Sequence, residues 1–265
     1  MTIAERILLA LSRPPEQSDY PEGENAGRVE NALHSLEQCF PDLLNLVRGQ
    51  RVLDFGCGGG AQAVALVQQG ARRVVGLDTN EHTLEGARTL AREHGINEDR
   101  LCFAAKLPGE LAGTFDIVIT QNAMEHFPDP EGTVAEMHTA LRDHGRILVT
   151  FGPPWFAPFG SHMHFFTRVP WVNILFSERT VMQVRSRFRS DGAKRYEEVE
   201  SGLNRMTVAR FERLVSRAGM RMEWRNYRCV KGLSFLGRPP VVRELFINDI
   251  SCILVREDSA ARKRR

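Results

Sequence analysis

The stretch VLDFGCGGG at residues 52–60 decides the fold. Its apolar start predicts a short buried strand, and the glycines that follow predict a tight turn leading into a helix. Glycines leave the backbone amides of such a turn open to a bulky ligand, and a helix N-terminus favours negative charge. The stretch therefore predicts a ligand-binding loop at the edge of a sheet.

A second acidic residue supports this interpretation. The next apolar run ends at Asp78, 24 residues after Asp54. An acidic residue at the tip of the second strand can accept hydrogen bonds from both hydroxyls of a nucleotide ribose. The glycine spacing is GxGxG rather than the GxGxxG of nicotinamide-dependent enzymes, and position 61 is alanine. Because some of those enzymes accept alanine there, a dinucleotide-dependent enzyme stays an alternative.

Short apolar runs alternate with segments of helical periodicity from Gly49 onward, which predicts an α/β fold with βα units around a parallel sheet. We expect strands at 51–55, 73–77, 101–104, 115–120 and 146–151, the last preceded by a turn at 143–145. We expect helices at 61–69, 81–93 and 132–141. A helix at 206–219 and two strands at 220–230 and 247–256 complete the expected order.

The chain divides into an N-terminal helical cap at 1–48, a main domain at 49–257 and a basic tail at 258–265. Apolar residues near 3.6 spacing predict that 29–46 of the cap are helical. Within the main domain, residues 153–205 are aromatic, basic and irregular. We expect this insertion to cover the ligand-binding edge of the sheet.

Composition excludes several classes of protein. No apolar run approaches the ~20 residues that a membrane-spanning helix needs, and the first residues do not resemble a secretory signal. The five cysteines are scattered without a CxxC pair, which favours a reducing compartment and a cytoplasmic protein. Residues 1–150 carry 13 basic and 22 acidic residues, whereas residues 151–265 carry 22 and 11. The basic half either meets an anionic partner or docks on the acidic half.

Together, residues 52–60, 76–78 and 115–130 resemble motifs I, II and IV of the class I S-adenosylmethionine-dependent methyltransferases. The resemblance is closest to the small-molecule branch (methyltransferase type 11/12) that includes the ubiquinone-biosynthesis O-methyltransferases, and it covers residues 49–152 well. It implies a Rossmann-like seven-stranded mixed sheet of order 3-2-1-4-5-7-6, whose last strand is antiparallel. It also implies an S-adenosylmethionine site formed by Asp54, Phe55, Gly56, Gly58, Gly60, Asp78, Thr79 and Gln121.

One departure from the family concerns the adenine. The family commonly has an acidic residue just after strand three, where it binds the adenine amino group. Residues 103–106 read FAAK here. The adenine contact must therefore come from the backbone or from elsewhere in the chain.

Candidates for proton transfer follow the fourth and fifth strands. Glu125 and His126 lie in the segment after the fourth strand, at the edge where ligands bind. His162 and His164 lie in the aromatic segment after the fifth strand, and histidine is a general base of near-neutral pKa. The alternative is that the Glu-His pair orders its loop and that the aromatic residues are packed. We expect one of the histidines to act as the base.

Two further features leave alternatives open. One feature resembles the metal-binding ExxEH segment of small-RNA 2′-O-methyltransferases, and it consists of Asn122, Glu125 and His126 with the later His164. The first glutamate of that segment is replaced by Asn122 here, and hard cations prefer carboxylate oxygens, so we predict no metal. The arginine-rich segment 179–195 either holds phosphate, carboxylate or RNA, or is a solvated surface.

The leading interpretation is methylation of oxygen on a small or medium-sized acceptor, possibly anionic. One alternative is a metal-assisted RNA 2′-O-methyltransferase, for which nucleic acid is the partner and ranks second to a small molecule. The other alternative is a non-catalytic protein with a methyltransferase fold.

Overall fold

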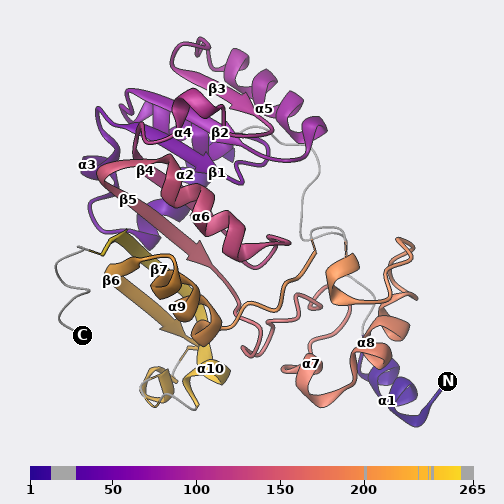
Figure 1. Cartoon of the computed structure of the whole chain (residues 1–265). Helices are drawn as coiled ribbons and strands as arrows, with labels where there is room; N and C mark the ends of the chain where they lie inside the picture. The colour runs from indigo at the N-terminus through magenta and orange to yellow at the C-terminus, as the bar shows by residue number, and fades with distance from the viewer. Residues whose placement is uncertain (13–27, 200–201, 232, 238, 240–241, 258–265) are drawn as a thin grey trace.

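The computed structural model describes residues 1–12, 28–199, 202–231, 233–237, 239 and 242–257, and a seven-stranded sheet forms its centre (Figure 1). The sheet order is β3-β2-β1-β4-β5-β7-β6, with β7 antiparallel to both of its neighbours. The predicted fold class and strand order are therefore confirmed. The strands are β1 (Arg51–Phe55), β2 (Arg73–Leu77), β3 (Leu101–Ala104), β4 (Phe115–Gln121), β5 (Leu141–Phe151), β6 (Met220–Cys229) and β7 (Ile247–Arg256).

Helices cover both faces of the sheet. One face carries α2 (Arg28–Cys39), α3 (Leu43–Val47), α4 (Ala61–Gln68) and α5 (Glu81–Glu93). The other carries α6 (Pro130–Ala140) and α9 (Val208–Arg217). The short elements are η1 (Gly109–Leu111), η3 (Ser234–Gly237) and α10 (Arg243–Phe246).

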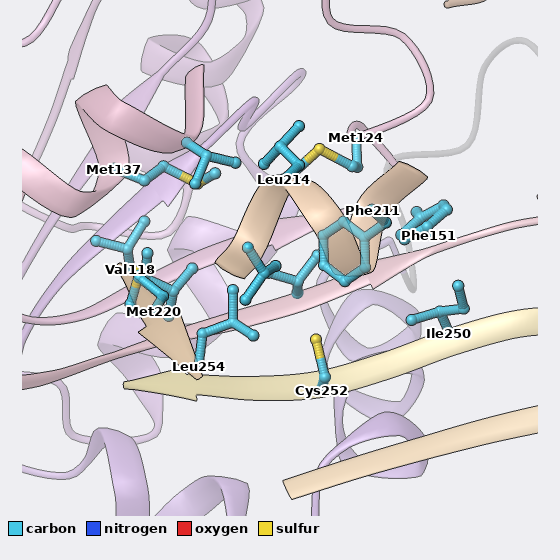
Figure 2. Close-up of a cluster of buried hydrophobic side chains, with 14 of the residues drawn as sticks. Val118, Met124, Met137, Phe151, Phe211, Leu214, Met220, Ile250, Cys252 and Leu254 are labelled. Carbon is cyan, nitrogen blue, oxygen red and sulfur yellow. The ribbon is translucent and has the colours of Figure 1, made fainter. Parts of the chain in front are cut away.

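Strand residues alternate between the two cores because successive side chains of a strand point to opposite faces. In β1, Val52 belongs to the core under α2 and α4, and Leu53 belongs to the core under α6 and α9. Figure 2 shows the second core, where Phe211 of α9 lies against Phe151 of β5, with ring centroids 5.0 Å apart. Each fully buried side chain of this kind contributes roughly 1.5–3 kcal/mol.

Three predicted boundaries were wrong, each for a local reason. Residues 29–46 form two helices rather than one, because Pro41 interrupts the helix and Asp42 has a left-handed backbone (φ 57°). The helix α6 begins before residue 132 because Asp129 caps it and Pro130 fits its first turn. The strand β5 begins at Leu141, so the predicted turn at 143–145 lies inside the strand. It forms an irregularity there, in which His144 has φ 63°.

A third core lies apart from the sheet. The helices α7 (Val172–Leu175) and α8 (Glu178–Arg185) and η2 (Tyr196–Glu198) fall within the insertion, and α1 (Ile3–Leu11) packs against α8. Leu8 of α1 is fully buried in this core with Phe166 and Val181. We call residues 1–12 together with 155–199 the lid; Figure 1 shows α1, α7 and α8 grouped away from the sheet.

The predicted N-terminal cap therefore contributes α1 to the lid and α2 and α3 to the sheet. The predicted basic tail at 258–265 and residues 13–27 of the cap lie outside the described residues. Within the described part of the chain, no helix is both long and apolar enough to cross a membrane.

Candidate functional site

The glycine loop joins β1 to α4 and has the backbone that its sequence predicts. The φ angles of Gly56, Gly58 and Gly60 are 80°, 49° and 78°, a left-handed backbone conformation that residues other than glycine rarely adopt. At Gly60 a Cβ would lie 2.7 Å from the Cβ of Ala87 and 2.9 Å from Cζ of Phe103. Glycine at this position therefore lets the loop lie directly against α5 and β3.

Asp78 is joined to the glycine loop by a hydrogen bond. The amide of Gly58 donates to Oδ2 of Asp78 at 3.0 Å, and the amide of Asn80 donates to its Oδ1 at 2.9 Å. The amides of Gly56 and Cys57 both donate to the Leu77 carbonyl at 2.8 Å. The loop and the tip of β2 thus form one rigid unit, with Phe55 just before the loop and the exposed Thr79 just after Asp78.

Asp54 is buried at the end of β1, and its partner was not predicted from the sequence. Nε2 of Gln62 donates to Oδ1 of Asp54 at 2.6 Å, while Oδ2 of Asp54 has no hydrogen-bond partner among the residues that the structure describes. Burial raises the pKa of Asp54 to about 7, against the opposing effect of the Gln62 hydrogen bond. The only signal for Gln62 is its place in the first turn of the helix that follows the loop.

The aromatic ring of Phe103, in β3, packs against β2 and the glycine loop, just before the position expected to contact the adenine. A Cβ at Gly76 would lie 2.5 Å from Cδ1 of Phe103, so the ring of Phe103 packs directly on the backbone of β2. The ring also reaches Gly60 of the glycine loop. Phe103 thus presents an apolar surface beside Asp78 and the loop.

The segment after β4 is tied to the end of β5. Gln121 ends β4, and the amide of Asn122 donates to the Thr150 carbonyl at 2.8 Å. The amide of Gly152 donates to Oε1 of the buried Glu125 at 3.2 Å, whereas Oε2 has no hydrogen-bond partner in the described part of the chain. Burial raises the pKa of Glu125 above its ordinary value. These contacts favour a role for Glu125 in ordering the loop.

The three candidate histidines have different surroundings. Nδ1 of His126 lies 2.7 Å from the Gly202 carbonyl oxygen, and the ring centroids of His126 and His162 are 5.5 Å apart. Burial, followed by the proximity of His126, lowers the pKa of His162 to about 4. His164 is exposed. The structure therefore brings His126 and His162 together, at the edge where β4 and β5 end.

The residues of the metal hypothesis and of the arginine-rich segment have the following surroundings. Within the described residues, no group of three or more His, Cys, Asp and Glu side chains is placed to hold a metal ion. In the segment 179–195, Arg185 is buried and pairs with both carboxylate oxygens of Asp191 at 2.6 and 2.7 Å. The guanidinium of Arg189 lies 5.1 Å from the ring centroid of Phe165. Part of the arginine run thus stabilises the lid itself.

The part of the chain that carries the glycine loop is similar to known proteins. Residues 53–149 match a family model described as a methyltransferase domain. The ubiquinone biosynthesis O-methyltransferase of Pseudomonas aeruginosa (strain UCBPP-PA14) is 36% identical over 103 residues, which are 38% of this chain and 44% of that protein. The protein of the same name from Bordetella avium (strain 197N) is 42% identical over 108 residues, 40% of this chain and 44% of the relative. The chain spans about half the length of the curated relatives it matches.

Solved structures share the fold over most of the chain. The magnesium protoporphyrin IX methyltransferase of Synechocystis PCC 6803, solved with bound SAH, has a TM-score of 0.54 and 16% identity. The match covers 90% of each chain. At this identity the similarity shows the fold alone, and the lid and the histidines take no support from it.

Proposed function

We propose that this chain, whose residues 53–149 are a class I S-adenosylmethionine-dependent methyltransferase domain, methylates an oxygen of a small or medium-sized acceptor. One observation carries the proposal: the Gly58 amide holds the Asp78 carboxylate at the mouth of the glycine loop. This arrangement holds an acidic acceptor for the ribose hydroxyls directly against the glycine loop. The curated relatives are named O-methyltransferases, which supports oxygen as the acceptor atom.

The residues of this edge fit S-adenosylmethionine. No atom of the described residues lies within 4 Å of a Cβ built at Gly58, so the described part of the chain leaves the loop open on that side. Asp78 is placed to accept from the ribose hydroxyls, and the Phe103 ring offers an apolar surface to the adenine in place of the missing acid. When bound, the cofactor supplies an electrophilic methyl group. The proposed site is completed by Phe55, Gly56, Gly60, Thr79 and Gln121. Asp54 is buried beneath the loop and belongs to the same proposed site.

Among the proposed bases, His126 has the most suitable geometry. The Gly202 carbonyl is only an acceptor, so the nitrogen 2.7 Å away must donate, which leaves Nε2 of a neutral His126 free to accept a proton from the acceptor hydroxyl. His162 is a weaker base because its pKa lies at about 4. Glu125 orders the loop, and His164 stays a candidate on the exposed side of the site.

The lid supports a pocket for the acceptor next to these histidines. His162 belongs to the first part of the lid after β5, and Gly202 belongs to the segment that follows the lid. Trp155 and Tyr196 pack edge to face, with ring centroids 4.8 Å apart. Exposed arginines of the lid, among them Arg179 and Arg187, favour an acceptor with a negative charge.

Calorimetry with S-adenosylmethionine tests the cofactor assignment. The wild type should bind it, and Asp78→Ala should weaken binding at least tenfold. Asp143→Ala is the matched control, because this carboxylate is exposed near the start of β5 and pairs with Arg256 at 3.1 Å. An absence of binding by the wild type would overturn the proposal.

Transfer of labelled methyl groups to a panel of phenols, hydroxy acids and RNA tests the acceptor class. Product on a small hydroxylated acceptor supports the proposal. Product on RNA alone contradicts it.

A further inference from the structure

Residues 202–206, which we call the strap, connect the lid to α9 and touch both cores. Leu203 is buried in the lid core, whereas Met206 is buried in the core between the sheet and α9. The Trp155 amide donates to the Met206 carbonyl at 2.7 Å, so the strap runs beside the segment that enters the lid. The strap is therefore held at both ends by packing.

Asn204, at the middle of the strap, binds the loop that carries His126. Its backbone amide donates to the Glu125 carbonyl at 2.9 Å. Its side-chain Nδ2 donates to the carbonyls of Met124 and Phe127, both at 2.8 Å. One residue thus satisfies three carbonyls of a single turn, and this fixes the position of the loop relative to the strap.

The same strap contacts the ring of His126. The Gly202 carbonyl oxygen lies 2.7 Å from Nδ1 of His126, two residues before Asn204. A carbonyl oxygen cannot donate, so this contact requires a proton on Nδ1. The neutral ring then carries its lone pair on Nε2, which is the nitrogen that the His126 mechanism uses.

We propose that Gly202 and Asn204 are positioning residues that select the Nδ1-protonated tautomer of His126. Asn204 holds the loop and Gly202 holds the ring, so the packing of the lid determines which nitrogen can accept a proton. No position in the glycine loop is involved. The inference rests on the proposed function in one respect, because the tautomer matters to catalysis only if His126 is the base.

Nitrogen-15 NMR of the histidine rings tests the tautomer without an acceptor. In the wild type, neutral His126 should be protonated at Nδ1. In Asn204→Ala, the ring should show an exchange-averaged mixture of tautomers, because the loop loses two of its three hydrogen bonds to residue 204. A wild-type ring protonated at Nε2, or an unchanged ring in Asn204→Ala, would overturn the proposal.

Asn173→Ala is the matched control. The Nδ2 atom of Asn173 donates to the Trp155 carbonyl at 2.8 Å, so this variant also removes an asparagine amide from a backbone carbonyl, in this case within the lid. It does not touch the His126 loop and should leave the tautomer unchanged. If Asn173→Ala shifts the tautomer as much as Asn204→Ala does, the effect is general loosening and the proposal fails.

Gly202→Val keeps the test valid if Asn204→Ala does not fold. Gly202 has φ 62°, and a Cβ there would meet only ordinary contacts at 3.5 Å or more. Valine avoids this left-handed backbone, so the substitution should displace the Gly202 carbonyl and shift the tautomer in the same direction. An unchanged ring in a folded Gly202→Val protein contradicts the proposal.

Binding and turnover separate this inference from the proposed function. Asn204→Ala should bind S-adenosylmethionine like the wild type and lower kcat about tenfold with an unchanged KM for the cofactor. If the wild type binds no cofactor, the proposed function fails whatever the tautomer. If it binds and turns over but Asn204→Ala is fully active, only the strap proposal fails.

Discussion

Gln62 donates its side-chain amide to Asp54 at 2.6 Å, and both residues are buried beneath the glycine loop. Asp54 lies one residue before the end of β1 and Gln62 lies in the first turn of α4, so this bond joins the two elements that the loop connects. We expect Gln62→Leu to lower the free energy of unfolding by about 1–3 kcal/mol, because it leaves the buried Asp54 carboxylate without any hydrogen-bond donor.

Urea unfolding of Gln62→Leu beside Gln68→Leu checks this expectation. Gln68 lies on the same helix but is exposed, and its replacement should change the stability by no more than about 0.5 kcal/mol. Equal losses in the two variants would show that the bond to Asp54 contributes nothing specific.

Within the glycine loop, Gly60 is the position whose replacement should be most damaging. A methyl group there would lie 2.7 Å from Ala87 Cβ, on a backbone with φ 78°. Gly60→Ala should cost about 1–2 kcal/mol from the left-handed conformation and about 1–3 kcal/mol from overpacking. Displacement of the loop should also weaken S-adenosylmethionine binding at least tenfold.

The neighbouring Gly86→Ala provides the control for Gly60→Ala. Gly86 is exposed within α5, and a Cβ there would meet nothing within 4 Å. Alanine should stabilise this helix by about 0.5–1 kcal/mol. Urea midpoints and calorimetry report both effects, and normal cofactor binding by Gly60→Ala would refute the close-packing argument.

His162 should make the protein sensitive to acid. Burial and the nearby His126 lower the pKa of His162 to about 4, whereas the unfolded chain takes up this proton near the ordinary value of 6.5. Between these values the unfolded state binds more protons, so stability falls as the pH is lowered from 6.5 to 4. The loss from this group amounts to at most about 3 kcal/mol.

Comparison with His162→Asn isolates this contribution. Asparagine tolerates the left-handed backbone of residue 162, whose φ is 55°, and does not titrate. The stability of the wild type relative to the variant should fall between pH 6.5 and pH 4 and stay constant above pH 7.5. Denaturant unfolding at several pH values measures it, and a difference that does not change with pH would rule out a buried neutral His162.

The sequence predicted the sheet and the glycine loop because their signals are local. Each strand is marked by a short apolar run, and the glycines and Asp78 lie at the ends of such runs. The resemblance to methyltransferases then predicted the order of the strands in the whole sheet. The site residues proposed for the cofactor therefore lie on the elements where they were expected, although their roles stay predictions.

The contacts of the lid could not be predicted in the same way. His126 meets Gly202, and Leu8 packs with Val181, across long stretches of chain that share no periodicity. The asparagine at 204 satisfies backbone carbonyls, which leave no trace in the sequence of the loop that it binds. Gln62 likewise looks like an ordinary polar residue of a helix until the burial of Asp54 is known.

The packing of α1 on the lid gives the last prediction. Leu8 is fully buried between α1 and the insertion, whereas Ile7 on the same helix is 49% exposed. Leu8→Ala should destabilise the lid by about 2–5 kcal/mol, and Ile7→Ala should have little effect. Because the lid core is separate from the two cores on the sheet, the loss should be local. Hydrogen exchange should accelerate in α8 while β1 and β4 keep their protection. Faster exchange throughout the sheet would show instead that the lid and the sheet unfold as one unit.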